Sequence, residues 1–350
     1  MESGDWVTVG IDNGGTCNNA TVLDAGGRFL VDTMAELPSL VREGPDKAIP
    51  ALVDSFDAVL AMTGVPRDRV RAVGLDTPGP ASATGVLAAG GATNFGHADW
   101  DKFDIRGALE ARLGLPVLYN NDGNAATLYA HHVRYGAESW RRGSVSAIIG
   151  TGFGGGVITE GRIVTGATGF AGEVGHVPIQ MNGLLEADQP LPSCNCGLAG
   201  DSESVASLTG IQRNLLPYWL TRYPDHELAA VSVEAGAKLV RGYAERDDEM
   251  ALNIFRQQAM AIGRVFSLAG KFTDPDAYFV GGGVIQTRPH FRDWFLDLIQ
   301  RNTDLYPEQA AVAEFALVPD LDMAGARGAA IAAAEWVREN GLRLSRRPRP

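Results

Sequence analysis

The sequence predicts a mixed α/β protein, and three observations support this class. Short apolar segments near the start of the chain are separated by glycine turns, which is typical of an antiparallel meander. Helical and extended patterns then alternate up to about residue 120, which favours parallel strands joined by helices. A similar strand-turn-strand pattern begins again near residue 145, which suggests an internal duplication.

The first third of the chain shows its elements in a clear order. Residues 49–60 place apolar side chains at i, i+3, i+4 and i+7 spacing, and Gly64 is suited to end that helix. Residues 117–120 form an apolar run too short for a helix, and Asn121 and Asp122 are favoured N-cap residues for a helix that follows. The predicted strands are 6–12, 20–23, 28–31, 70–75 and 117–120, with a further helix over 104–113.

The remainder of the chain continues this alternation. The predicted strands are 145–149, 156–158 and 277–280, and the predicted helices are 233–245, 248–272 and 326–337. Residues 341–350 have no sustained periodicity, so we expect this tail to be disordered.

Composition disfavours several classes of function. The 350 residues include 42 acidic and 30 basic side chains, and the net charge of −12 disfavours a nucleic-acid-binding surface. No apolar run approaches the roughly 18 residues of a membrane span, and the N-terminal residues lack the pattern of a signal peptide. Only three cysteines occur, too few and too oddly spaced for a secreted disulfide framework. We therefore expect a cytoplasmic protein with neither a nucleic-acid nor a membrane partner.

Asp122 is the first candidate for chemistry, because it lies where a predicted strand ends and a helix begins. Ligands bind at the carboxyl ends of strands in open α/β sheets, and a carboxylate there can accept a proton from a bound hydroxyl. The alternative is that Asp122 only caps the helix, which is the commoner role of such a residue.

The segment from Asp12 to Thr16 is the first candidate phosphate loop. Gly14 and Gly15 lack a Cβ, so their backbone amides can face a phosphate, and Thr16 offers a hydroxyl. Asp12 can hold Mg²⁺ directly or through water. The alternative is a glycine hairpin in which Asp12 satisfies its own turn.

Two further glycine-rich segments are candidates for nucleotide binding. Residues 149–157 contain Gly-x-Gly-x-x-Gly spacing, but the residues that follow alternate like a hairpin strand instead of opening a helix. A second phosphate loop, with Thr151 near the γ-phosphate, therefore fits better than a dinucleotide fold. Residues 281–283 follow a predicted strand, and glycines there let the backbone approach a flat ligand such as adenine with its ribose.

A polar segment and a cysteine pair complete the candidates. Cys194 and Cys196, with a histidine and a carboxylate, have the ligand types of a zinc site. The alternative is that the two cysteines are buried or unreactive and bind no metal. Glu173 precedes His176 by three positions in a glycine-rich segment. Such a loop can present polar side chains to a small polar ligand, although both residues are also common on plain surfaces.

Taken in order, these segments resemble the ROK family of sugar kinases, which belongs to the actin and hexokinase-like superfamily. The family pattern consists of an Asp-x-Gly-Gly-Thr loop, a Pro-Gly loop, an Asn-Asp-x-Asn-Ala segment, a Gly-Thr-Gly-x-Gly-Gly-Gly loop, a Gly-Glu-x-Gly-His segment and a Cys-x-Cys-Gly cluster ending in Glu. The corresponding residues are 12–16, 78–80, 121–125, 150–156, 172–176 and 194–203.

The resemblance implies a two-domain actin/hexokinase-like (ribonuclease H-like) α/β fold with the active site in the interdomain cleft. The implied N-terminal small α/β domain is 1–121 together with about 323–340. The implied C-terminal large α/β domain is 122–322. The family fold also suggests a homodimer.

The resemblance further implies transfer of the γ-phosphate of Mg-ATP to a hydroxyl of a free hexose, with glucose as the expected substrate. Asp122 would be the base that accepts the proton of the attacking hydroxyl. The residues expected to hold the sugar are Asn94, Asn121, Glu173, His176 and Glu203. Those expected around ATP and Mg²⁺ are Asp12, Gly14, Gly15, Thr16, Thr151, Gly152, Gly281, Gly282 and Gly283.

Three positions depart from the family pattern. Cys17 stands where a Lys is usual, Asp201 stands where the family has a third cysteine, and the segment 177–193 looks longer than usual. His176, Cys194, Cys196 and Asp201 can still complete a four-ligand zinc site, since Asp is an acceptable ligand. Alternatively, no metal binds and Asp201 caps a helix that starts at Ser202.

Other functions stay open at this point. A kinase for an amino sugar, an acylated sugar or a cyclitol is possible, because the long segment and Asp201 leave room for another substrate. A sugar-responsive repressor, as found in the same family, is disfavoured because only 11 residues precede Asp12 and the acidic charge offers no DNA-binding face. A sugar-binding protein that has lost catalysis is consistent with Cys17, but the retained Asp122 and both phosphate loops oppose it.

Overall fold

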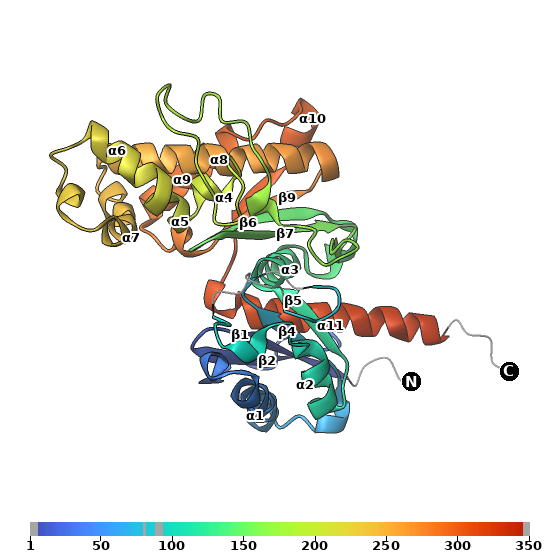
Figure 1. The fold of residues 1–350 in the computed structure, drawn as a ribbon. Helices are drawn as coiled ribbons and strands as arrows, with labels where there is room; N and C mark the ends of the chain where they lie inside the picture. Colours follow the sequence, from blue (N-terminus) through green and yellow to red (C-terminus); the bar gives the residue numbers. More distant parts are fainter. Residues whose placement is uncertain (1–5, 80–81, 88–93, 346–350) are drawn as a thin grey trace. The chain divides into compact units, whose positions relative to one another are not determined.

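The computed structural model describes residues 6–79, 82–87 and 94–345, which form two compact units (Figure 1). Unit 1 runs to Ser139 and adds residues 163–172 and the chain from Pro319 onward, whereas unit 2 holds Trp140–Arg162 and Glu173–Val318. The strands are β1 (Val7–Asn13), β2 (Cys17–Asp24), β3 (Ala35–Pro38), β4 (Val70–Thr77), β5 (Val117–Asn121), β6 (Ser144–Ile149), β7 (Phe153–Thr159), β8 (Arg162–Ile163), β9 (Ala277–Gly281) and β10 (Glu314–Leu317). The helices are α1 (Pro45–Thr63), α2 (Ile105–Leu113), α3 (Asp122–Tyr135), α4 (Glu203–Ala206), α5 (Leu208–Gly210), α6 (Leu216–Arg222), α7 (Val233–Ala244), α8 (Glu249–Thr273), α9 (Pro289–Arg301), α10 (Pro307–Ala310) and α11 (Leu321–Ser345).

The sheet of unit 1 has the strand order β3-β2-β1-β4-β5. β1 pairs antiparallel with β2, as the glycine turn between them requires, and β4 pairs in parallel with both β1 and β5. The carboxyl ends of β1, β4 and β5 therefore meet at one edge of the sheet. Asp12, Asp76 and Asn120 are aligned across these three strands at that edge.

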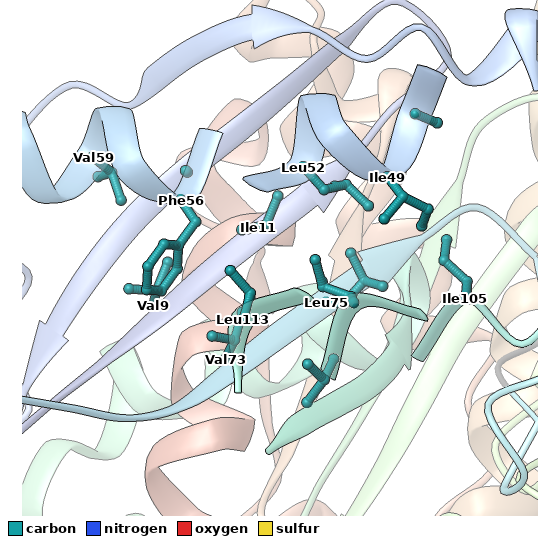
Figure 2. Close-up of a cluster of buried hydrophobic side chains, with 14 of the residues drawn as sticks. Val9, Ile11, Ile49, Leu52, Phe56, Val59, Val73, Leu75, Ile105 and Leu113 are labelled. Carbon is teal, nitrogen blue, oxygen red and sulfur yellow. The ribbon is translucent and has the colours of Figure 1, made fainter. Parts of the chain in front are cut away.

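Different helices cover the two faces of this sheet. Side chains alternate along each strand, so neighbouring residues of one strand pack against opposite helix layers. Val9 and Ile11 on β1 join residues of α1 and α2 in one apolar core (Figure 2). On the opposite face the Thr8 hydroxyl donates to the carbonyl of Ala330 in α11. A Cβ on Gly10 would lie 2.0 Å from the carbonyl oxygen of Ala326, so only glycine lets α11 pack this closely.

The sheet of unit 2 has the strand order β10-β9-β6-β7-β8. Read from β8, this order reproduces that of unit 1: an antiparallel pair, β6 with β7, is followed by the parallel strands β9 and β10. The duplication suggested by the sequence is thus confirmed at the level of topology. The long helix α8 packs against α4, α7 and α9 (Figure 1).

The structure differs from the sequence expectation in the third strand. Residues 28–31 make only one isolated bridge, Leu23 with Phe29, and the strand that pairs with β2 is β3. The cause is a tight turn at Asp24, whose carboxylate accepts the backbone N–H of Arg28 at 2.9 Å. Phe29 then packs edge-on against Tyr129 with ring centroids 6.1 Å apart, so this segment serves as a packed loop.

Two boundaries also differ from those expected. α3 belongs to unit 1, whose first segment runs to Ser139 instead of ending at residue 121. It is held there by α11, since Gly328 is so close to Ala125 that a Cβ would lie 1.8 Å from the Ala125 carbonyl oxygen. α11 extends to Ser345, into the tail expected to be disordered, because no proline interrupts the chain before Pro348. Residues 346–350 lie outside the described residues.

Among the helices of the described ranges, none has the length and apolar character needed to cross a membrane.

Candidate functional site

The turn after β1 has the tight geometry expected of the first glycine loop. The N–H of Gly14 donates to the carbonyl of Cys17 at 3.0 Å, which closes the turn between β1 and β2. Asp12 lies on β1 just before this turn. Burial, opposed by a hydrogen bond from Asn19 and reinforced by the charge of Asp122, raises the pKa of Asp12 to about 6. A bound cation would stabilise the charged form of this carboxylate.

The side chain of Asn94, an expected sugar contact, lies against Gly15 of this turn. A Cβ on Gly15 would be 2.5 Å from both Cγ and Oδ1 of Asn94. The second glycine of the loop is therefore needed to make room for the side chain of Asn94. Of the Pro-Gly loop at 78–80, Pro80 lies outside the described residues.

At the end of β5, the helix α3 is capped by Asn121 and not by Asp122. The Asn121 Oδ1 accepts the backbone N–H of Asn124 at 2.8 Å, as an N-cap residue does. Asp122 occupies the first helical position, where its Oδ1 receives the N–H of Gly123 at 2.8 Å and its side chain is exposed to solvent. The atoms packed around the carboxylate remove part of its hydration, and this desolvation, partly offset by backbone hydrogen bonds, raises the pKa of Asp122. Capping thus does not explain this carboxylate, which is free to meet a solvent-borne hydroxyl.

The second glycine segment is a hairpin turn in unit 2, as the sequence predicted. Ile149 pairs with Phe153 at the end of the β6–β7 ladder, and the N–H of Gly150 donates to the carbonyl of Gly152 at 3.0 Å. The turn is tied to α4, because Glu203 Oε2 accepts the N–H of Phe153 at 2.8 Å. A Cβ on Gly152 would lie 2.8 Å from the same oxygen, so this glycine leaves room for Glu203.

A pocket of about 300 Å³ opens in unit 2 beside this hairpin. Thr151 and Gly283, two of the residues expected around the nucleotide, contribute to its wall, and so do Lys238 and Arg241 of α7. The Arg241 guanidinium donates to the carbonyl of Gly283. The sequence did not predict that residues of α7 and α8 line this pocket. The amphipathic pattern of these two helices indicated only that one face of each is buried. The lining residues are Ile149, Gly150, Thr151, Leu208, Ile211, Ala237, Lys238, Arg241, Phe255, Gln258, Gly283 and Val284.

Gly282 gives the end of β9 its sharp bend. Its φ of +89° is in the region that favours glycine, and a Cβ there would lie 2.2 Å from the carbonyl oxygen of Ile149. Gly281 ends β9 and Gly283 begins a short 3-10 turn. The three glycines thus let the backbone turn beside the β6–β7 hairpin.

The structure brings His176, Cys194, Cys196 and Asp201 together in unit 2. One ligand atom from each lies within 4.8 Å of the others. His176 Nδ1 is 3.2 Å from Asp201 Oδ2 and 3.8 Å from Cys194 Sγ, and Cys196 Sγ is 3.4 Å from the same Asp201 oxygen. The donor set of one nitrogen, two sulfurs and one oxygen fits zinc.

Asp201 is placed so that it could take either of the roles that the sequence left open. Its Oδ2 faces the cluster, and its Oδ1 accepts the N–H of Ser204 at 2.9 Å at the start of α4. Burial acts to raise the pKa of Asp201, but the hydrogen bonds from His176, Cys194, Ser204 and Cys196 lower it overall. Asp201 is fully buried and therefore needs these partners.

The expected contact residues are thus distributed over both units. Unit 1 carries Asp12, Gly14, Gly15, Thr16, Asn94, Asn121 and Asp122, and unit 2 carries Thr151, Gly152, Glu173, His176, Glu203, Gly281, Gly282 and Gly283.

Comparison with known proteins identifies the family. The family model described as ROK family matches residues 8–335. The chain belongs to the ROK family. A glucokinase of Halalkalibacterium halodurans is 31% identical over 313 residues, 88% of each chain. An N-acetylmannosamine kinase of Citrobacter koseri is 29% identical over 282 residues, 79% of this chain and 83% of its own length.

Two solved ROK structures share the fold. The ROK hexokinase from Thermus thermophilus is 29% identical with a TM-score of 0.75, covering 95% of this chain and 99% of its own. The ROK glucokinase from Streptomyces griseus, solved in complex with glucose and AMPPNP, is 28% identical with a TM-score of 0.66, covering 94% of this chain and 99% of its own. The actin/hexokinase-like α/β class expected from the sequence is confirmed.

Within the ROK family pattern, the departure at Cys17 has a clear structural setting. The Cys17 thiol donates to Glu36 Oε1 at 3.3 Å across the β2–β3 pair. This hydrogen bond raises the pKa of Cys17, so the thiol is neutral at physiological pH. The first glycine loop therefore has no cation at this position.

Proposed function

We propose that this protein is an ATP-dependent hexose kinase that transfers the γ-phosphate of Mg-ATP to a hydroxyl of a free hexose, with glucose as the first candidate. The position of Asp122 carries the proposal, because its carboxylate is exposed at the first turn of α3, whereas Asn121 and not Asp122 caps that helix. The similarity to a bacterial glucokinase and to a ROK glucokinase solved with glucose and AMPPNP supports the substrate class.

In this proposal Asp122 accepts the proton of the sugar hydroxyl that attacks the γ-phosphate. Its raised pKa brings the carboxylate closer to the working pH, where a general base is most effective. Asn94 and Asn121 from unit 1, and Glu173, His176 and Glu203 from unit 2, would hold the other hydroxyls. Fixing the ring in this way supplies the orientation on which phosphoryl transfer depends.

The phosphates of ATP would lie on the two glycine turns. Gly14, Gly15 and Thr16 offer backbone and hydroxyl donors, and Thr151 and Gly152 offer a second set. The pocket lined by Gly283 and α7 would take the nucleoside. Mg²⁺, when bound, neutralises charge on the β- and γ-phosphates, and Asp12 is the carboxylate placed to hold it.

The cluster of His176, Cys194, Cys196 and Asp201 fits a structural zinc ion. His176 would hold the ion through Nδ1, which faces Asp201, and its ring would then be fixed in orientation for sugar binding. We also propose a cytoplasmic location, which suits the three cysteines because none of them forms a disulfide. A homodimer remains part of the proposal and rests on the family resemblance alone.

A panel of sugars with Mg-ATP tests the function. We expect ADP release with one free hexose and a loss of more than about a hundredfold in kcat for Asp122→Asn, with little change in the KM for the sugar. Asp68→Asn, an exposed aspartate outside the site, is the matched control. Sugar binding without turnover in the wild-type protein would instead support a binding protein.

The second candidate is a kinase for an acylated amino sugar. The N-acetylmannosamine kinase relative favours it, and the same panel decides between the two when N-acetylmannosamine and a cyclitol are included. A higher kcat/KM for N-acetylmannosamine than for glucose would replace the first candidate with the second.

A further inference from the structure

Asp76 is a second carboxylate beside the expected magnesium ligand, and the sequence reasoning did not single it out. It is the register partner of Asp12 on the neighbouring parallel strand β4. Register partners in a parallel pair point to the same face of a sheet. Both carboxylates therefore lie on the face covered by α11, at the carboxyl ends of their strands.

Gly325 of α11 confirms that the two side chains converge. A Cβ on Gly325 would lie 2.6 Å from Asp76 Oδ2 and 3.0 Å from Asp12 Oδ2. The two oxygens thus border the same small space at the start of α11. A side chain at position 325 would collide with both carboxylates, so glycine is needed there to let them approach each other.

Asp76 has no partner that accounts for its burial. Its exposed fraction is 1%, and neither carboxylate oxygen has a hydrogen-bond partner among the described residues under ordinary geometric criteria. A buried carboxylate beside another one is costly unless a positive charge lies between them.

We propose that Asp12 and Asp76 together bind one divalent metal ion directly, and that this ion binds without nucleotide. Two carboxylate oxygens with water completing the shell are the donors that Mg²⁺ and Mn²⁺ prefer. The inference builds on the proposed role of Asp12 in holding Mg²⁺, and it adds Asp76 as a ligand. Asp76 then supplies negative charge that anchors the ion before ATP arrives.

Titration of the metal-free protein with Mn²⁺, followed by electron paramagnetic resonance of the free ion, tests this site in the absence of nucleotide and sugar. We expect one Mn²⁺ per chain for the wild type and binding weaker by at least about tenfold for Asp76→Asn, which removes one of two charged ligands. Asp68→Asn is the matched control and should bind like the wild type. Cys196→Ser should also bind like the wild type, because a thiolate site disfavours Mn²⁺.

The outcomes separate this inference from the proposed kinase activity. No nucleotide-free Mn²⁺ binding by the wild type, or unchanged binding by Asp76→Asn, overturns the site while leaving sugar phosphorylation to be judged by turnover. Melting curves of each variant without metal show whether it is folded, and Asp12→Asn provides a second variant in which the same loss of binding is expected. Retained binding by Asp12→Asn also overturns the site.

Discussion

The side-chain amide of Asn94 packs against the α-carbon of Gly15. A Cβ at Gly15 would lie 2.5 Å from Cγ of Asn94. This contact joins the expected phosphate turn to an expected sugar contact within unit 1. A substitution in the turn should therefore alter sugar binding indirectly, by displacing the side chain of Asn94.

Gly15→Ala should raise the KM for the sugar as well as the KM for ATP, because the new methyl group displaces Asn94. The expected loss in kcat/KM is about tenfold or more, corresponding to one lost hydrogen bond to the substrate. Gly96→Ala is the matched control, since a Cβ there has no heavy atom within 4 Å. Steady-state kinetics with each substrate varied in turn provide the measurement. An effect on ATP alone would show that Asn94 does not contact the sugar.

Zinc removal should weaken sugar binding together with stability. The cluster that His176 shares with Asp201 also fixes the N–H of Ser204 at the start of α4, the helix that carries Glu203. Elemental analysis of protein purified without added metal should give about one zinc per chain. Asp201→Ala should lose the metal, lower the melting temperature and raise the sugar KM, whereas Asp201→Cys should keep the metal. Protein without zinc that binds sugar normally would contradict the metal site.

Activity should fall as the pH is lowered through about 6. Burial raises the pKa of Asp12 to about 6 and also raises that of Asp122, so both carboxylates bind protons closer to neutrality than an exposed aspartate does. A protonated Asp122 cannot accept the hydroxyl proton, and a protonated Asp12 holds a cation poorly. The profile of kcat/KM against pH is the measurement. A profile that stays flat down to about pH 4.5 would rule out control by these two groups.

Asp76→Asn should stabilise the metal-free protein at neutral pH. The pKa of Asp76 is raised in the folded state, so its carboxyl favours folding at acidic pH and opposes folding as the pH rises through that value. Removing the buried charge should increase the free energy of unfolding at pH 7 by about 1–3 kcal/mol. Urea unfolding with a chelator present measures the difference, which should shrink at acidic pH. An equal or lower stability of Asp76→Asn at pH 7 would contradict the buried charge.

The sequence predicted those parts of the fold that depend on local patterns. The glycine hairpin at residues 150–152 was recognised because the alternating residues after it cannot open a helix. The ligand types and the spacing of Cys194 and Cys196 predict a zinc-type cluster, and the family resemblance adds Asp201. The structure brings these residues together with His176 and shows that Asp201 also faces the start of α4. These signals lie within short stretches of chain.

Features that depend on long-range packing were not predicted. Lys238 and Arg241 lie in a segment for which the sequence predicts only a helix, and the tertiary structure places them beside Gly283. Asp76 directly follows the predicted strand 70–75, and only the tertiary structure brings it beside Asp12 of the neighbouring strand and Gly325 of α11. The prediction of a third strand at residues 28–31 was wrong, and β3 takes that place. The turn at Asp24 and the packing of Phe29 hold residues 28–31 as a loop despite their apolar pattern.

The position of α11 at the end of the chain affects the order in which the two units fold. Gly10 and Gly74, on strands near the start of the chain, are left without side chains so that α11 can lie on them. Until the ribosome has synthesised α11, that face of the first sheet stays uncovered, whereas most of unit 2 is already complete. Unit 2 is therefore expected to fold during translation, and unit 1 only after α11 has emerged.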